Sequence, residues 1–244
     1  MRIWTFAKRC GQEILRDPLN LAFGLGFPVV LLLLLSAIQA NVPVSLFEIQ
    51  SLAPGVTVFG LAFFTLFSAT LLAKDRESAF LQRLYATPLT AQEFILGYML
   101  PVLPMALVQC AVCYLFSMAL GLSWTAGILY ALFGVLPIAV FYVALGLLCG
   151  CVLNVKQVGG VCGALLTNLS AWLSGVWFDL SLVGGGFEKI AKLLPFVHAV
   201  EMERGLLAGN FSAVLPNFLV VMGYAVLVLA IAVVVAARRF GKER

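Results

Sequence analysis

Few residues in this chain have the types and spacing that catalysis or metal binding requires. Ser174-Gly175 and the single histidine, His198, have the composition of a serine–histidine pair, but the GxSxG surround of such nucleophiles is missing. Cys110-x-x-Cys113 has redox spacing but lies in an apolar stretch without a histidine. No GxxxxGK[ST] phosphate-binding loop occurs. We therefore expect a chain that is not an enzyme and binds no metal or cofactor itself.

The composition predicts an integral membrane protein. Only 11% of the 244 residues are charged and 63% are hydrophobic, whereas soluble domains carry about a quarter charged residues. No soluble domain, repeat or basic aromatic patch indicates nucleic-acid binding. The six cysteines lie in or beside apolar segments, and we interpret them as small packing residues.

Six apolar runs are long enough for the roughly 20 residues with which a helix crosses a bilayer. We therefore predict an all-α membrane protein with six transmembrane helices in a single domain, 1–244. The expected spans are Leu21–Ile38, Leu52–Ala73, Phe94–Leu120, Thr125–Leu153, Val158–Phe178 and Val214–Ala237. Pro101, Pro104 and Pro137 are candidate kinks in the third and fourth spans.

Two further helical segments are expected outside the spans. Residues 1–18 place Ile3, Ala7, Cys10 and Ile14 on one stripe, which predicts an amphipathic helix on the membrane surface. Residues 179–213 are too long for a tight turn and carry periodic apolar residues, which predict short external helices interrupted at Pro195. Glu201, Glu203 and Arg204 there are candidates for pairing with each other or with a neighbouring subunit, or for a solvated surface.

The distribution of Lys and Arg predicts the orientation. With the N-terminus inside, cytoplasmic segments hold twelve of the fifteen basic residues, and only Lys189, Lys192 and Arg204 fall outside. We therefore expect a multi-pass protein of the plasma or inner membrane with both termini in the cytoplasm. The spans hold no charged residue at midplane depth, which indicates that any driving energy is supplied from elsewhere.

The longest polar interval inside this apolar chain is 74–94, KDRESAFLQRLYATPLTAQEF. Phe80, Leu81 and Leu84 share one side of a short helix that Thr87-Pro88 ends. A surface helix between two spans has a shape that transmits force from a soluble partner into a membrane domain. We interpret the interval as a cytoplasmic coupling loop.

Three motifs make the chain resemble the membrane subunits of ABC-2-type transporters, which share an exporter fold with the G-subfamily half-transporters. The first is the N-terminal helix running through Arg16-Asp17-Pro18 to Phe27-Pro28. The second and most specific is Lys74-Asp75-Arg76-Glu77 followed by Leu84-Tyr85-Ala86-Thr87-Pro88-Leu89. The third is Leu194-Pro195-Phe196-Val197-His198-Ala199 ahead of Arg204-Gly205-Leu206-Leu207-Ala208-Gly209.

The resemblance implies a complex of two membrane subunits, identical or different, with two separate ABC ATPase subunits that carry the ATP and Mg. It implies that the 74–94 loop docks into the ATPase and that the Asn154–Gln157 turn makes a second, smaller contact. The implied coupling residues are Arg76, Glu77, Arg83, Leu84, Thr87 and Pro88. The implied substrate path follows the second and fifth spans, with Phe59, Phe63, Phe67, Asn168 and Trp172 as its candidate residues.

Three functions remain open at this point. The first is an ATP-driven exporter of drugs, antibiotics, lipids or similar amphiphiles, whose cavity would be lined by aromatic and apolar residues. The second is a permease for lipid-linked polysaccharide, which the spans do not distinguish from the first. The third is a structural or assembly protein of the membrane, which needs no polar cluster.

Overall fold

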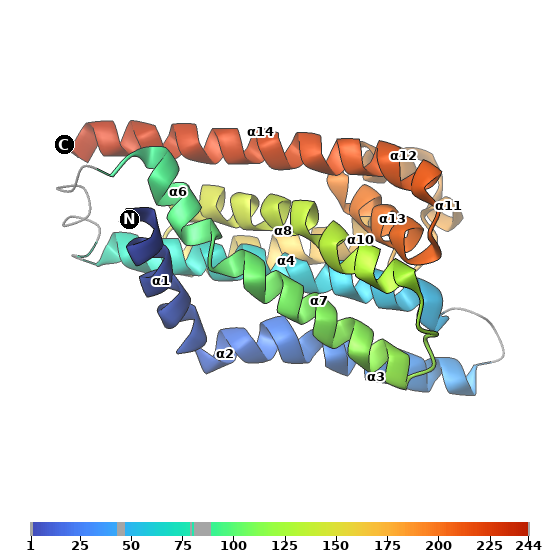
Figure 1. Ribbon diagram of the computed structural model, residues 1–244. Coiled ribbons are helices and arrows are strands. Elements are labelled where there is room, and N and C mark those ends of the chain that lie inside the picture. Colours follow the sequence, from blue (N-terminus) through green and yellow to red (C-terminus); the bar gives the residue numbers. More distant parts are fainter. Residues whose placement is uncertain (1, 43–46, 79, 81–88, 244) are drawn as a thin grey trace.

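The structure, a computed structural model, describes residues 2–42, 47–78, 80 and 89–243. All regular structure in these residues is helical, and the long helices run side by side with α14 along one flank and α3 along the other (Figure 1). The two ends of the chain lie at the same end of the bundle, here called the terminal end, and helices α11 to α13 lie at the opposite, far end (Figure 1).

Five stretches within the described residues are long and apolar enough to cross a membrane, so this is an integral membrane protein. They are Ala22–Asn41 (η1 Ala22–Gly26 and α3 Phe27–Asn41), α4 Ile49–Glu77, Ala91–Ala119 (α6 Ala91–Met99 and α7 Val102–Ala119), α8 Ala126–Val152, and Phe211–Arg239 of α14 (Phe211–Glu243). Five of the six expected spans are thereby confirmed as helices of membrane length.

The predicted fifth span, Val158–Phe178, is helical but ends early. Helices α9 (Val155–Val158), η2 (Gly159–Leu166) and α10 (Thr167–Leu173) follow one another without a gap. The expected end at Phe178 is wrong because Gly175 takes a left-handed φ of 69° and turns the chain. Polar residues such as Lys156, Gln157 and Asn168 make this stretch less apolar than the other five, so a sixth crossing stays a prediction.

The kink expected in the third span lies at Pro101. Helix α6 ends at Met99 and α7 begins at Val102, because proline has no amide hydrogen to continue the helix. Pro104 and Pro137 lie inside α7 and α8 without ending them. The break lets α6 lie against the N-terminal helix while α7 continues along the bundle (Figure 1).

Helix α4 is the core of the bundle, and its residues from Leu52 to Leu72 are buried on almost every side. It packs most extensively against α8, where small side chains bring the two backbones together. The Thr65 hydroxyl donates to the Tyr142 carbonyl of α8 at 3.0 Å, and the Ser68 hydroxyl lies 3.3 Å from the Val143 carbonyl.

The far end is covered by α11 (Leu180–Val183), α12 (Gly185–Leu193) and α13 (Pro195–Ala208). Gly184 and Gly209 have φ of 62° and 70°, which favour glycine, and they end α11 and α13. The predicted interruption at Pro195 is confirmed, because α13 begins at this residue and Leu194 before it is extended.

Helix α1 (Arg2–Leu15) lies where the N-terminal helix 1–18 was expected and is followed by α2 (Pro18–Leu21) and η1. The predicted apolar stripe buries Ala7, Cys10 and Ile14, together with Phe6, against α6 and the end of α4. The stripe therefore packs on protein, and contact of α1 with the membrane surface stays a prediction.

The α4–α8 contact should depend on Gly146, because a Cβ atom at this position would overlap the Ser68 hydroxyl and the Thr65 carbonyl. We expect Gly146→Ala to lower the free energy of unfolding by about 1–3 kcal/mol through overpacking. Equilibrium unfolding of the purified protein in detergent measures this. Gly223→Ala on α14 is the matched control, since a Cβ atom there meets nothing within 4 Å; an equal loss in both variants would contradict the assignment.

Candidate functional site at the end of helix α4

Helix α4 ends in four consecutive charged residues, Lys74-Asp75-Arg76-Glu77, and each side chain bonds a different part of the terminal end. Lys74 lies 3.7 Å from the Asp17 carboxylate, between α1 and α2. The other three contact α1 and α6, the end of α8, and the start of α9. We call this set of four residues the α4 hub.

Asp75 is the buried member of the hub, with a relative exposure of 3%. Both its carboxylate oxygens accept hydrogen bonds from the Arg9 guanidinium of α1, at 2.8 Å for the Nη2–Oδ1 pair. The Tyr98 hydroxyl of α6 donates to Oδ2 at 2.6 Å. A carboxylate out of water needs such partners, so Asp75 ties α4 to α1 and α6.

Arg9 is held from several sides. Its Nη2 lies 2.6 Å from the Glu13 carboxylate one turn along α1, and its guanidinium carbon lies 4.0 Å from the centre of the Phe80 ring. Burial alone would lower the pKa of Arg9, but the hydrogen bonds and charge of Asp75 raise it above its ordinary value. The charge on Arg9 is therefore permanent, and it reaches from α1 to the segment that follows α4.

An aromatic cluster surrounds this ion pair. The Phe6 ring stacks on Phe94 at 6.1 Å and on Phe80 at 6.3 Å, and meets Tyr98 edge-on at 5.0 Å. Gly97 makes room for it, because a Cβ atom there would overlap the Phe6 ring. The Asp75 side chain is shielded from water here, whereas the Arg9 side chain stays one-third exposed, and the burial of Asp75 strengthens the attraction between the two charges.

Arg76 and Glu77 hold the turn between α8 and α9. Arg76 Nη1 donates to the carbonyls of Gly150 at 2.6 Å and Leu153 at 3.1 Å, where the last carbonyls of α8 lack helical partners. Glu77 Oε1 accepts a hydrogen bond from the Val155 amide at 3.0 Å. This amide lies at the N-terminal end of α9, where the helix dipole is positive and favours a carboxylate. Within the turn, Asn154 and Gln157 form a capping box that starts α9.

The structure describes only two of the six predicted coupling residues. Arg76 and Glu77 bond other parts of the same chain, and their contact with an ATPase stays a prediction. Arg83, Leu84, Thr87 and Pro88 lie outside the described residues, as does most of the expected short helix. The Asn154–Gln157 turn, expected as a second contact, lies directly against the hub.

The predicted substrate-path residues divide into two groups. Phe59, Phe63 and Phe67 are buried inside the chain, where Phe63 packs edge-on against Phe27 and Phe59 against Trp177. Asn168 and Trp172 lie exposed on α10, with 55% of Trp172 accessible. The Asn168 amide donates to the Ala164 carbonyl of its own helical stretch, at 2.8 Å.

The residues with catalytic or redox spacing are not assembled into a site. The Ser174 hydroxyl donates to the Ala171 carbonyl at 3.0 Å, while the His198 ring bonds Asn217 at 2.7 Å and the Lys192 carbonyl at 2.8 Å. Cys110 and Cys113 are buried free thiols. The described residues contain no group of three or more His, Cys, Asp or Glu side chains arranged to hold a metal ion.

A second buried carboxyl lies on α13, outside the five spans. Glu203 has no exposed surface; its Oε1 accepts from the Tyr114 hydroxyl of α7 at 3.2 Å, and its Oε2 has no hydrogen-bond partner in the described chain. Burial raises the pKa of Glu203 to about 8. Of the three charged residues named as candidates for pairing, Arg204 pairs with Glu201 at 2.8 Å, whereas Glu203 is buried apart from them.

Sequence comparison agrees with this architecture. A family model described as ABC-2 type transporter matches residues 1–208, and the chain belongs to this family. No curated protein sequence matches the chain significantly. The match covers the N-terminal helix, the α4 hub and the helices of the far end.

Removal of Arg9 should destabilise the protein more than removal of Lys74. We expect Arg9→Ala to cost about 3 kcal/mol, the lower part of the range for breaking a buried ion pair, because the Arg9 side chain is one-third exposed. Lys74→Ala should cost less than about 1 kcal/mol, since its pair with Asp17 is long and exposed. Unfolding in detergent gives both values.

The double variant Arg9→Ala/Asp75→Asn separates the charge from the packing. The amide that replaces the Asp75 carboxylate still accepts the Tyr98 hydrogen bond but no longer leaves a charge unpaired, so the double variant should be more stable than Arg9→Ala alone. A double variant as unstable as the sum of the two single changes would show that the ion pair does not hold α1 in place.

Glu203 should make stability depend on pH. The folded state keeps the carboxyl proton up to about pH 8, whereas the unfolded chain loses it above its ordinary value near 4.5. Stability is therefore full below the ordinary value and falls as the pH rises towards 8, by about 1 kcal/mol per pH unit. Glu203→Gln should flatten this dependence in unfolding measured from pH 5 to 8; Glu201→Gln, an exposed neighbour, should leave it unchanged, and an unchanged slope in Glu203→Gln would contradict the prediction.

Proposed function

We propose that this chain is the membrane-spanning subunit of an ATP-driven ABC exporter and works as a dimer with two separate ATPase subunits. Family membership supports a transporter permease. The α4 hub is the observation that carries the proposal further. A single helix end bonded to α1, α6, α8 and α9 distributes a force applied beside it over most of the terminal end.

The terminal end faces the cytoplasm in this proposal. Among the described side chains, Lys8, Arg16, Lys74, Lys156 and Arg238 belong to this end, together with Arg9, Arg76 and Arg239, while Lys189, Lys192 and Arg204 belong to the far end. This asymmetry supports a cytoplasmic location of both termini through the positive-inside rule. The ATPases would then approach the hub and the segment 79–94 from the cytoplasm.

The mechanism follows from the contacts of the hub. When nucleotide binding closes the two ATPases, the segment after Glu77 is pushed, and α4 moves with it. Asp75 transfers the movement to α1 and α6, and Arg76 and Glu77 transfer it to the α8–α9 turn and hence to the start of the fifth helical stretch. Arg76 and Glu77 are in this view positioning residues that join the two cytoplasmic loops into one unit.

The exported compound is an amphiphile in this proposal. Trp172 and Asn168 are the exposed members of the candidate path, so a substrate or the second subunit meets them directly on α10. Phe59 and Phe63 are buried, so they contribute to the path by packing behind the exposed residues and not by contacting the substrate. A path of aromatic side chains with few polar groups suits a large apolar body with a polar head.

Co-expression with an ABC ATPase encoded beside this chain tests the proposal. We expect the two proteins to purify together in mild detergent and to transport an amphiphilic dye in proteoliposomes only when ATP is supplied. An ATPase variant that lacks the catalytic carboxylate should bind but not drive transport. Transport by the permease alone, or a permease that purifies without any ATPase, would overturn the proposal.

Charge reversal at the hub should uncouple transport from ATP hydrolysis. Arg76→Glu places a carboxylate against the carbonyls of Gly150 and Leu153, so a charged hydrogen bond becomes a repulsion and transport per ATP should fall about tenfold. Arg83→Glu should lower substrate-stimulated ATPase activity in the same way. Arg238→Glu, the same charge change on exposed α14 at the same end, is the control. Unchanged coupling in both Arg76→Glu and Arg83→Glu would contradict the role of this loop.

A further inference from the structure

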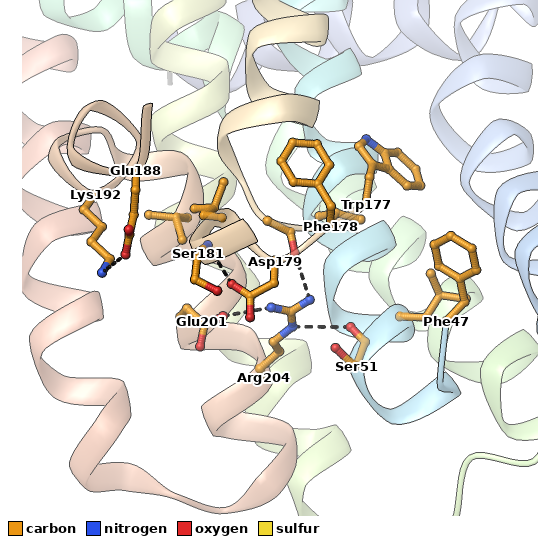
Figure 2. A pocket seen from close by; sticks show the side chains of 15 residues that line it. Phe47, Ser51, Trp177, Phe178, Asp179, Ser181, Glu188, Lys192, Glu201 and Arg204 are labelled. Carbon is orange, nitrogen blue, oxygen red and sulfur yellow. Dashed lines mark hydrogen bonds and ion pairs between the residues drawn. The ribbon is translucent and has the colours of Figure 1, made fainter. Parts of the chain in front are cut away.

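The far end holds a cavity of about 480 Å³ that the proposed function does not use. It lies between the start of α4, the turn after α10, and helices α12 and α13 (Figure 2). The ring side chains of Phe47, Trp177 and Phe178 line it together with several charged groups. Its volume is in the range of sites that hold drug-sized molecules.

Hydrogen bonds from Arg204 connect the segments that line the cavity. Its three guanidinium nitrogens donate to Glu201 at 2.8 Å, to the Gly175 carbonyl at 3.2 Å and to the Ser51 carbonyl at 3.4 Å (Figure 2). These bonds join α13, the turn after α10 and the first turn of α4. Three of the five N–H groups of Arg204 are thus used by protein partners, and its charge is paired with that of Glu201.

The charges that line the cavity leave one carboxylate in excess. Three carboxylates, those of Asp179, Glu188 and Glu201, face two cations, Lys192 and Arg204. Lys192 pairs with Glu188 at 2.5 Å and Arg204 with Glu201, whereas Asp179 forms no ion pair with the described side chains. Its Oδ1 instead accepts the Ser181 amide at 2.9 Å at the start of α11.

Asp179 keeps its charge at neutral pH. Hydrogen bonds from the Ser181 amide and hydroxyl hold the pKa of the Asp179 carboxyl below its usual range. The Trp177 and Phe178 rings immediately precede it in the chain and line the same cavity (Figure 2). The Asp179 side chain is exposed. A cavity lined by aromatic rings and by one carboxylate in excess attracts cations, because the faces of aromatic rings carry partial negative charge.

We propose that this cavity binds amphiphilic organic cations, with the cationic centre near Asp179 and the apolar body among Phe47, Trp177 and Phe178. Trp177 also packs edge-on against Phe59 at 5.4 Å, which connects the cavity to the helix of the candidate path. The inference rests on the proposed function in taking this ligand to be the exported substrate held at the outer end of the path. Amphiphilic organic cations are therefore the substrate class that we propose for the exporter.

Binding of tetraphenylphosphonium to the purified permease, without ATPase, tests the proposal. This probe carries a permanent positive charge on four aromatic rings, and tetraphenylborate is its counterpart of the same shape and opposite charge. We expect equilibrium dialysis in dodecyl maltoside, corrected for uptake by protein-free micelles, to show saturable binding of the cation and none of the anion. Absent cation binding, or equal binding of both ions, would overturn the proposal.

Two pairs of variants locate the site. Asp179→Asn keeps an oxygen to cap the Ser181 amide but removes the charge, so affinity should fall about threefold to fivefold while the melting temperature is unchanged. Glu48→Gln removes one charge from the exposed residue before α4, outside the cavity, and should leave affinity unaltered. Trp177→Leu should weaken binding about fivefold, whereas Trp124→Leu, at an exposed tryptophan of the far end, should not. Equal effects within either pair would overturn the assignment.

The outcome is separable from that of the exporter test. Cation binding with the expected variant pattern, combined with failure to find an ATPase partner, would keep the cavity as a binding site and remove the transport role. ATP-driven transport of a dye without cation binding at Asp179 would keep the exporter and remove this substrate class.

Discussion

The buried Asp75 carboxylate is the constraint on which the terminal end of the structure depends. A carboxylate with 3% exposure at the end of an apolar helix is costly unless positive charge and hydrogen-bond donors surround it. Arg9 and Tyr98 supply both, and they come from α1 and α6, 66 and 23 residues away from Asp75 in the sequence. The Asp75 carboxylate therefore fixes where α1 and α6 lie relative to the end of α4, in addition to the apolar packing of α1 and the break at Pro101.

The membrane-spanning helices could be predicted well from the sequence, because each depends on the local density of apolar residues. The break at Pro101 and the start of α13 at Pro195 were predictable for a similar reason, since proline acts on its immediate neighbours. The end of the fifth stretch was not, because it depends on the left-handed conformation of Gly175, and glycine adopts either hand without preference.

The hub was only half predictable. The run Lys74-Asp75-Arg76-Glu77 is recognisable in the sequence because four charged residues interrupt an apolar chain. From this run we predicted a contact with a partner protein. Its bonds to Gly150, Leu153 and Val155 are made to backbone groups about 75 residues away. Every residue type has these backbone groups, so the amino-acid sequence does not indicate which of them will bond the hub. Arg9 and Tyr98 likewise showed no signal, because neither spacing nor composition reveals which cation meets which buried carboxylate.

Helix α14 has a length that bears on where the protein resides. Its 33 residues extend about 50 Å at 1.5 Å per residue, whereas the hydrocarbon layer measures about 30 Å. The excess requires a tilt or a projection of the final turns, and Arg238 and Arg239 can reach the lipid phosphates from there. The membrane-length part alone, Phe211–Arg239, has 29 residues and extends about 44 Å, so it matches thicker bilayers best. The lipid composition of the host membrane is therefore part of what determines the resting geometry of this subunit.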